Sequence, residues 1–177
     1  MLNLIFLLFF FGVARPAKAA AVPASAVVVN SAEMKNAMKD AKPTPGAIPG
    51  TFDLTMRSVD AGNSNVGVAL VRRLTAETHD AILHEKVTEI YYITEGSGML
   101  ETGGTLTEPK PFGTATGLPE IGPSERGTGI QGGTSRRVGM GDVVVIPAGM
   151  PHRFTSIDGP VSYIDYRVDP GKVTPLK

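Results

Sequence analysis

The sequence predicts an all-β sandwich or closed barrel with one short N-terminal helix. Three observations predict this fold class. From Thr51 onward, short apolar and β-branched runs alternate with turns that contain Gly or Pro. A pattern typical of a helix occurs only before that point. The length of 177 residues suffices for one domain with a proper core and is too short for two.

The first residues have the layout of a secretory signal peptide. An almost unbroken apolar run, Leu2 to Val13, is followed by Arg15-Pro16 and by the small-residue pattern Ala17-Lys18-Ala19. We therefore expect residues 1–19 to be cleaved near Ala19 and the mature protein to be secreted or periplasmic. A retained N-terminal tether is the alternative, because no Lys or Arg precedes the run. The run of about 12 apolar residues falls short of the ~20 that span a bilayer, so we expect no stable membrane span after cleavage.

Charge and cysteine content narrow the classes of function. The chain has 17 basic and 17 acidic residues, and loss of residues 1–19 removes Arg15 and Lys18 but no acid. The mature net charge is then 15 minus 17, or −2, which offers no basic field to recruit nucleic acid. Because the chain has no cysteine, disulfides and thiolate metal ligands are excluded. Any metal site must use Asp, Glu or the three histidines.

Residues 20–50 are expected to form an N-terminal arm around the helix. Asn30 and Glu33 have the spacing of a capping box, in which the two residues satisfy each other's backbone donors. The predicted helix runs from Ser31 to about Ala41. The loop after it contains the helix-ending residues Pro43, Pro45 and Gly46.

Residues 51–170 are predicted to form the β domain, and 171–177 a C-terminal tail. Phe52, Leu54 and Met56 alternate with polar residues, as expected for a half-buried strand. Further strands are predicted at 65–74, 89–93, 99–101, 143–146, 152–156 and 161–168. Gly, Thr and Pro dominate 103–137, which is too long for a hairpin connection. We therefore predict an inserted loop there, either a functional lid or a disordered insertion.

Two spaced motifs give the chain a family resemblance. The pattern G-x5-P-x-G-x2-H-x3-N is matched by Gly141, Pro147, Gly149 and His152, with Ser156 in place of Asn. The pattern G-x5-H-x-H-x3,4-E-x6-G is matched by His84, Glu89 and Gly96, with Ala76 and Ile82 in place of its opening glycine and first histidine. Over about residues 50–170 the chain thus resembles the cupin superfamily, in its small single-domain, type-2-like form. The resemblance implies a jelly-roll β-barrel or sandwich, and it specifies a fold far better than a reaction.

The candidate metal ligands are His84, Glu89 and His152. Each begins or ends a predicted strand, and the inward faces of a closed barrel converge, so the three side chains can meet. Two imidazoles and one carboxylate suit Fe(II) best, with Mn, Ni, Cu and Zn as alternatives. Ile82 either leaves a coordination position open for water, substrate or dioxygen, or marks a metal site that has been lost.

Two further residues are candidates for the site. Tyr91 shares a strand face with Glu89 and is the candidate catalytic residue, because its hydroxyl could orient a substrate; the alternative is core packing with that hydroxyl satisfied. His79 lies five residues before His84 and faces the other way in a continuous strand. A bulge would rotate it inward as another ligand, and otherwise it is a loop or surface residue.

These features predict an exported cupin that acts on a small organic molecule through a mononuclear divalent metal, with dioxygenase, isomerase or lyase chemistry. The alternative is a non-catalytic cupin that binds a small ligand, with an absent or vestigial metal; Ile82 and Ser156 favour it. The resemblance also implies homodimers formed through the sheets, to which outward Tyr92 and Ile90 could contribute. Alternation alone leaves open whether these two side chains meet a partner or the second sheet.

Overall fold

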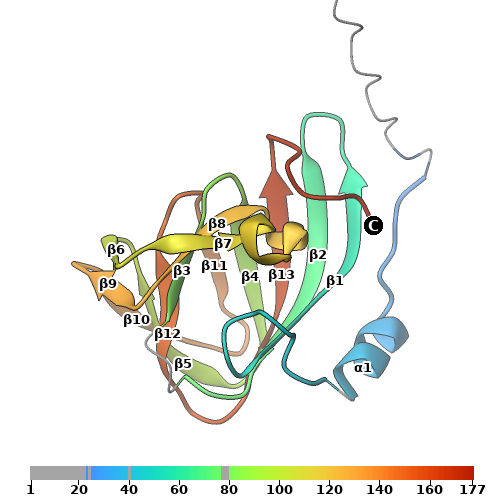
Figure 1. Ribbon diagram of the computed structural model, residues 1–177. Helices are drawn as coiled ribbons and strands as arrows, with labels where there is room; N and C mark the ends of the chain where they lie inside the picture. The colour runs from blue at the N-terminus through green and yellow to red at the C-terminus, as the bar shows by residue number, and fades with distance from the viewer. Residues whose placement is uncertain (1–22, 24, 40, 77–79) are drawn as a thin grey trace, which may run out of the picture.

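The structure is a computed structural model that describes residues 23, 25–39, 41–76 and 80–177. The predicted signal peptide at 1–19 and His79 lie outside the described residues. The described chain forms a β-sandwich of two main antiparallel sheets with one short α-helix beside it (Figure 1). The predicted all-β fold class with a single N-terminal helix is therefore confirmed.

The five-stranded sheet has the order β1-β2-β13-β4-β11. Its strands are β1 (Thr51–Asp60), β2 (Asn65–Arg73), β4 (Thr88–Glu95), β11 (Val143–Ile146) and β13 (Val161–Asp169). The six-stranded sheet has the order β10-β5-β12-β3-β8-β7. Its strands are β3 (Ala81–His84), β5 (Ser97–Thr102), β7 (Lys110–Gly113), β8 (Pro123–Gly127), β10 (Thr134–Gly139) and β12 (His152–Ile157). A small third sheet pairs β6 (Thr105–Thr107) with β9 (Gly129–Gln131).

The main core lies between the two large sheets. Alternation along β4 places Tyr91 and Ile93 in the core and leaves Tyr92 exposed on the outer face. Tyr92 thus faces outward as predicted, and its contact with a second copy stays a prediction. The buried side chains of this core come from both sheets: Val71, Tyr91, Ile93, Leu100, Val138, Ile146, Phe154, Val161 and Tyr163.

The helix α1 (Ser31–Lys39) is capped as the sequence predicted. The Asn30 side-chain oxygen accepts from the backbone N–H groups of Ala32 and Glu33, and a Glu33 carboxylate oxygen accepts from the Asn30 N–H, each at 3.0 Å. Glu33 also pairs with Arg57 on β1 at 2.7 Å, which ties the helix to the sandwich. No helix in the described ranges is long and apolar enough to cross a membrane.

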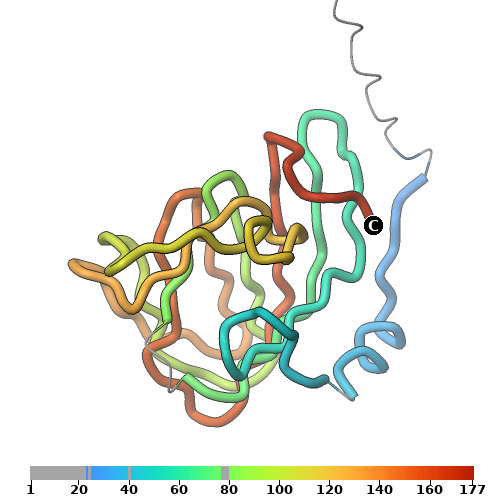
Figure 2. Tube along the Cα trace, viewed as in Figure 1, coloured from blue at the N-terminus to red at the C-terminus, as the bar shows by residue number. Residues whose placement is uncertain are grey.

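The prediction of an inserted loop at 103–137 is wrong. This segment contains β6, β7, β8, β9, the first part of β10 and two short 3₁₀ turns, η1 (Thr114–Thr116) and η2 (Pro119–Ile121). β8 pairs with β3 and β7 pairs with β8, which widens the six-stranded sheet. The trace in Figure 2 shows β6 and β9 projecting at the end of the molecule opposite β1 and β2. Backbone pairing between strands needs no apolar alternation, so composition alone missed these strands.

Candidate metal centre

The three candidate ligands meet between the two large sheets. His84 ends β3, Glu89 is the second residue of β4, and His152 begins β12. All three side chains are buried. The His84 Nε2 lies 3.2 Å from Glu89 Oε1, and the His152 Nε2 lies 3.2 Å from Glu89 Oε2. One ligand atom from each residue lies within 4.8 Å of the other two, a spacing that could hold one metal ion.

A turn links the strands that carry the two histidines. Gly149, in the turn before β12, has a φ of +80°, a conformation that glycine adopts without steric cost. Its N–H donates to the His84 carbonyl at 2.7 Å, and the Met150 N–H donates to the Pro147 carbonyl at 3.1 Å. This turn therefore holds the start of β12 against the end of β3, so its Pro and Gly help to bring His152 beside His84.

Hydrogen bonds orient both imidazole rings. His152 Nδ1 lies 3.1 Å from the Met150 carbonyl oxygen, which only accepts, so this nitrogen carries a proton. His84 Nδ1 lies 2.8 Å from Ser124 Oγ, whose own proton is directed to the Gly122 carbonyl at 3.1 Å. Ser124 Oγ is then the acceptor for His84. In the neutral rings, both Nε2 atoms present a lone pair toward Glu89.

The donor set fits a divalent metal. Within the described part of the chain, the buried Nε2 of His152 makes no hydrogen bond of good geometry, although it lies 3.2 Å from Glu89 Oε2. A buried polar atom without a partner is uncommon and calls for an explanation such as an ion. A metal between the two Nε2 atoms and the Glu89 carboxylate would satisfy it, and two imidazoles with one carboxylate are the donors that Fe(II), Mn(II) or Zn(II) accept.

Ser124 gives a direct test of the ring orientation. Replacing Ser124 with alanine removes the acceptor of the His84 N–H, and loss of such an outer partner typically weakens metal binding about 10–100-fold. We expect a drop of that size in competition titrations with a chelating dye. The matched control is Ser156→Ala, which removes an exposed hydroxyl on the strand of His152. Equal affinities in the two variants would refute this role for Ser124.

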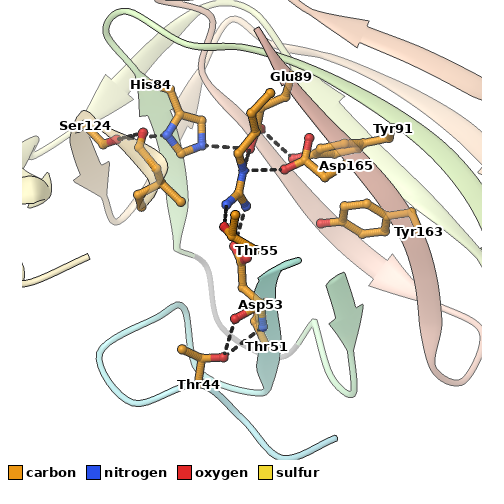
Figure 3. A network of polar contacts seen from close by, with 12 residues as sticks. Thr44, Thr51, Asp53, Thr55, His84, Glu89, Tyr91, Ser124, Tyr163 and Asp165 are labelled. Atoms are coloured by element: carbon orange, nitrogen blue, oxygen red, sulfur yellow. Dashed lines mark hydrogen bonds and ion pairs between the residues drawn. The ribbon is translucent and has the colours of Figure 1, made fainter. Parts of the chain in front are cut away.

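Tyr91 contacts Glu89 directly. Its hydroxyl donates to Glu89 Oε2 at 2.8 Å, and its ring lies 4.2 Å, between centroids, from that of Tyr163 (Figure 3). Burial, together with the negative charge of Glu89, raises the pKa of Tyr91 well above its ordinary value. Tyr91 therefore stays neutral and uses its proton to hold Glu89. Its predicted part in orienting a substrate stays a prediction.

A buried charge network that the sequence analysis missed lies behind Glu89. Arg167 Nε is 2.8 Å from Asp165 and 3.7 Å from Glu89, and Arg167 Nη2 is 2.6 Å from Asp53. Burial and the nearby Glu89 charge raise the pKa of Asp165 well above its ordinary value. Burial alone would also raise the pKa of Glu89, but the charge and hydrogen bonds of His84 and His152, when these rings are protonated, hold it well below its ordinary value. The sequence does carry a signal for this network. Asp165 and Arg167 lie two residues apart, so they share one face of the predicted strand 161–168.

Ile82 supplies no ligand at the position where the motif has its first histidine. It lies directly across from His152 in the β3–β12 pair and packs against Phe112 and Ile121. The position is therefore occupied by an apolar side chain on the inward face. Ser156, which replaces the Asn of the motif that contains His152, is exposed.

A cavity of about 280 Å³ opens beside the three ligands. One side of it is apolar and is formed by Ile82, Phe112, Leu118 and Ile121. The rest of the lining is mixed: it includes the polar residues Thr51, Thr55, Arg73 and Tyr163 and the apolar residues Ile48, Leu54 and Val71. Part of the segment 103–137 thus forms a wall of the cavity. A volume just below the usual 300–1,000 Å³ of drug-sized pockets suits a small molecule.

No protein-family model matches the chain, and no curated protein matches it in sequence. The solved structures that it resembles include the oxalate decarboxylase of Lactobacillus farciminis in a formate complex, with a TM-score of 0.47 and 16% identity over 75% of this chain and 32% of that one. An oxalate oxidase matches with a TM-score of 0.47 and 18% identity, over 73% of this chain and 56% of the oxidase. KdgF from Halomonas sp. matches with a TM-score of 0.40 and 16% identity, over 70% of this chain and 83% of KdgF.

These solved structures are cupin-fold proteins, the family that the two sequence motifs resemble. The chain spans less than two thirds of the oxalate decarboxylase and of the oxalate oxidase.

Proposed function

We propose that this protein is an exported, metal-dependent cupin that acts on a small organic molecule. His84, Glu89 and His152 would hold one divalent metal ion, with Fe(II) favoured. The observation that carries the proposal is the convergence of three buried donor atoms within 4.8 Å beside a cavity of about 280 Å³. A polarised or ionised small molecule bound at the metal is the common element of oxygenase, isomerase and lyase chemistry.

The chain's own residues prepare the site for that chemistry. Met150 and Ser124 fix the two imidazole rings, and Tyr91 holds one oxygen of Glu89. Ile82 offers no donor atom, so among the described residues His84, Glu89 and His152 would hold the metal. When bound, the metal supplies Lewis-acid polarisation of a substrate oxygen. Oxygenase-type chemistry is the leading candidate, because a two-histidine, one-carboxylate site with open positions suits it.

Metal loading tests the proposal first. We expect one divalent ion per chain by elemental analysis, and a metal-dependent rise in the unfolding temperature by calorimetry. A ligand that binds only the folded state stabilises it by about 2.7 kcal/mol at a free concentration one hundred times its Kd. Removal of the ion with EDTA should reverse the rise. If none of Fe(II), Mn(II), Ni(II), Cu(II) and Zn(II) binds or shifts the transition, the proposal fails. Oxygen uptake with phenolic, keto-acid and sugar substrates then tests the reaction class.

A non-catalytic ligand-binding protein is the second candidate. It is favoured by buried Ile82 at the position of a motif histidine. Elemental analysis of protein purified from its native host separates the two candidates, because this second function predicts no stoichiometric metal together with retained binding of a small molecule. Export is a proposal in either case, and N-terminal sequencing of the mature protein tests cleavage near Ala19.

A further inference from the structure

We propose that the cavity binds a small organic acid, with its carboxylate on Arg73 and a second oxygen toward His84, Glu89 and His152. This inference rests on the proposed function and names its substrate class. Arg73 is the last residue of β2 and shares the inward face of that strand with Val71.

Arg73 is held in place by neutral groups. Its Nε donates to the Tyr163 hydroxyl at 3.1 Å, and its Nη1 donates to Thr51 Oγ1 at 3.4 Å. Its guanidinium carbon lies 5.5 Å from the centroid of the Phe154 ring, within the range of a cation–π contact. These three contacts orient the guanidinium, and none of them comes from a carboxylate.

Arg73 has unused donors that face the cavity. A guanidinium carries five N–H donors, and the two hydrogen bonds of Arg73 use one each, at Nε and Nη1, so Nη2 has no hydrogen-bond partner among the described residues. No carboxylate pairs with Arg73 in the described part of the chain, whereas Arg167 contacts both Asp53 and Asp165. A planar guanidinium with free donors binds a carboxylate in bidentate geometry.

The placement of the charges in the cavity leaves Arg73 open to an anion. Asp53 and Asp165 face Arg167, and Glu89 faces the two histidines and the proposed metal. Two carboxylates thus share the one guanidinium of Arg167, and Glu120, the remaining acidic side chain of the lining, is exposed. No carboxylate of the described residues lies within ion-pair distance of Arg73. The other cation of the lining, Lys177, is exposed, and it donates to the Thr55 carbonyl. Arg73 is therefore the half-buried cation that a substrate carboxylate would meet.

The rest of the cavity lining indicates what the remainder of the bound acid looks like. The side chains of Ile82, Phe112, Leu118 and Ile121 are apolar and suit an apolar body. A volume of about 280 Å³ limits that body to a small one. A short acid fits this lining if it has an apolar side chain and a second oxygen next to its carboxylate. The apolar side chain would contact the apolar residues, and the carboxylate would contact Arg73.

The test uses 2-hydroxy acids and their amides as probes. Glycolate, lactate and 2-hydroxyisovalerate each have a neutral amide with the same skeleton. The protein is loaded with Zn(II), because Zn(II) is redox-inert and avoids redox turnover of the probes. By isothermal titration calorimetry, we expect at least one acid to bind more tightly than its amide. Arg73→Gln should weaken that acid about tenfold or more, as expected for loss of a charge-assisted hydrogen bond, and should leave the affinity of the amide unchanged.

Arg72→Gln is the matched control. Arg72 is the next residue on the opposite face of β2 and pairs with Glu95 at 3.0 Å, so its loss should not change acid binding. Unchanged zinc stoichiometry in Arg73→Gln shows that the site is intact, and Arg73→Lys should retain part of the preference for the acid. If no acid binds better than its amide, or if Arg73→Gln keeps full acid affinity, the inference is wrong. If the wild type binds no metal, the proposed function is wrong. Elemental analysis measures metal binding separately from acid binding, so the two failures can be told apart.

Discussion

Replacement of His152 with alanine is expected to abolish stoichiometric metal binding. His152 is buried at the start of β12, and its Nε2 faces Glu89 at 3.2 Å without a hydrogen-bond partner in the described part of the chain. Loss of an outer partner weakens metal sites about 10–100-fold, and loss of one ligand of three should exceed that range. Elemental analysis after dialysis against metal-free buffer measures the effect.

The control for this prediction is Phe154→Leu. Phe154 lies two residues further along β12 with its side chain also buried, so the substitution perturbs core packing near the site without removing a donor atom. We expect Phe154→Leu to keep one metal ion per chain. Circular dichroism and cooperative unfolding should show that both variants are folded. If His152→Ala retained the metal content of the wild type, the ligand assignment would be refuted.

Replacement of Arg167 with methionine is expected to cost about 3–5 kcal/mol of the free energy of unfolding. Methionine fills a similar volume but leaves Asp53 and Asp165 without the guanidinium that lies 2.6 and 2.8 Å from them. The cost arises because a buried carboxylate that loses its partner is neither solvated nor paired. Urea denaturation of the metal-free protein measures this cost separately from any effect on metal binding.

Two variants make the Arg167 prediction specific. Arg137→Met removes an exposed ion pair with Asp158, and such pairs contribute only about 0–1 kcal/mol. Asp165→Asn combined with Arg167→Met should recover part of the loss, because one uncompensated carboxylate is removed. If Arg167→Met cost no more than Arg137→Met, the buried network would have no special role in stability.

Local sequence patterns predicted most of the strands outside 103–137 and, together with the motif resemblance, the candidate ligands. Alternation put Glu89 and Tyr91 on one face of a strand, and the spacing of Pro147, Gly149 and His152 identified the turn before β12. Both patterns depend on neighbours within a few residues, which the sequence displays directly. The structure brings His84, Glu89 and His152 within 4.8 Å, in agreement with those patterns.

Only the tertiary structure revealed the residues that support this centre. Ser124 reaches His84 across 40 positions of the chain through the β3–β8 pair, inside a segment whose composition predicted a loop. Gly113 allows that arrangement, because at its φ of +66° an added Cβ would lie 2.1 Å from the Gly122 carbonyl oxygen. Residues that meet through pairing of distant strands leave no periodic signal in either strand.

The sequence by itself determined an all-β domain with two histidines and a glutamate on inward faces, because side-chain alternation and turn residues act locally. The tertiary structure decided which polar residues surround these three. Arg167 meets Asp53 across 114 positions and Arg73 meets Tyr163 across 90. Strand order and register set these contacts, and they are determined by the packing of the whole sandwich rather than by any one segment.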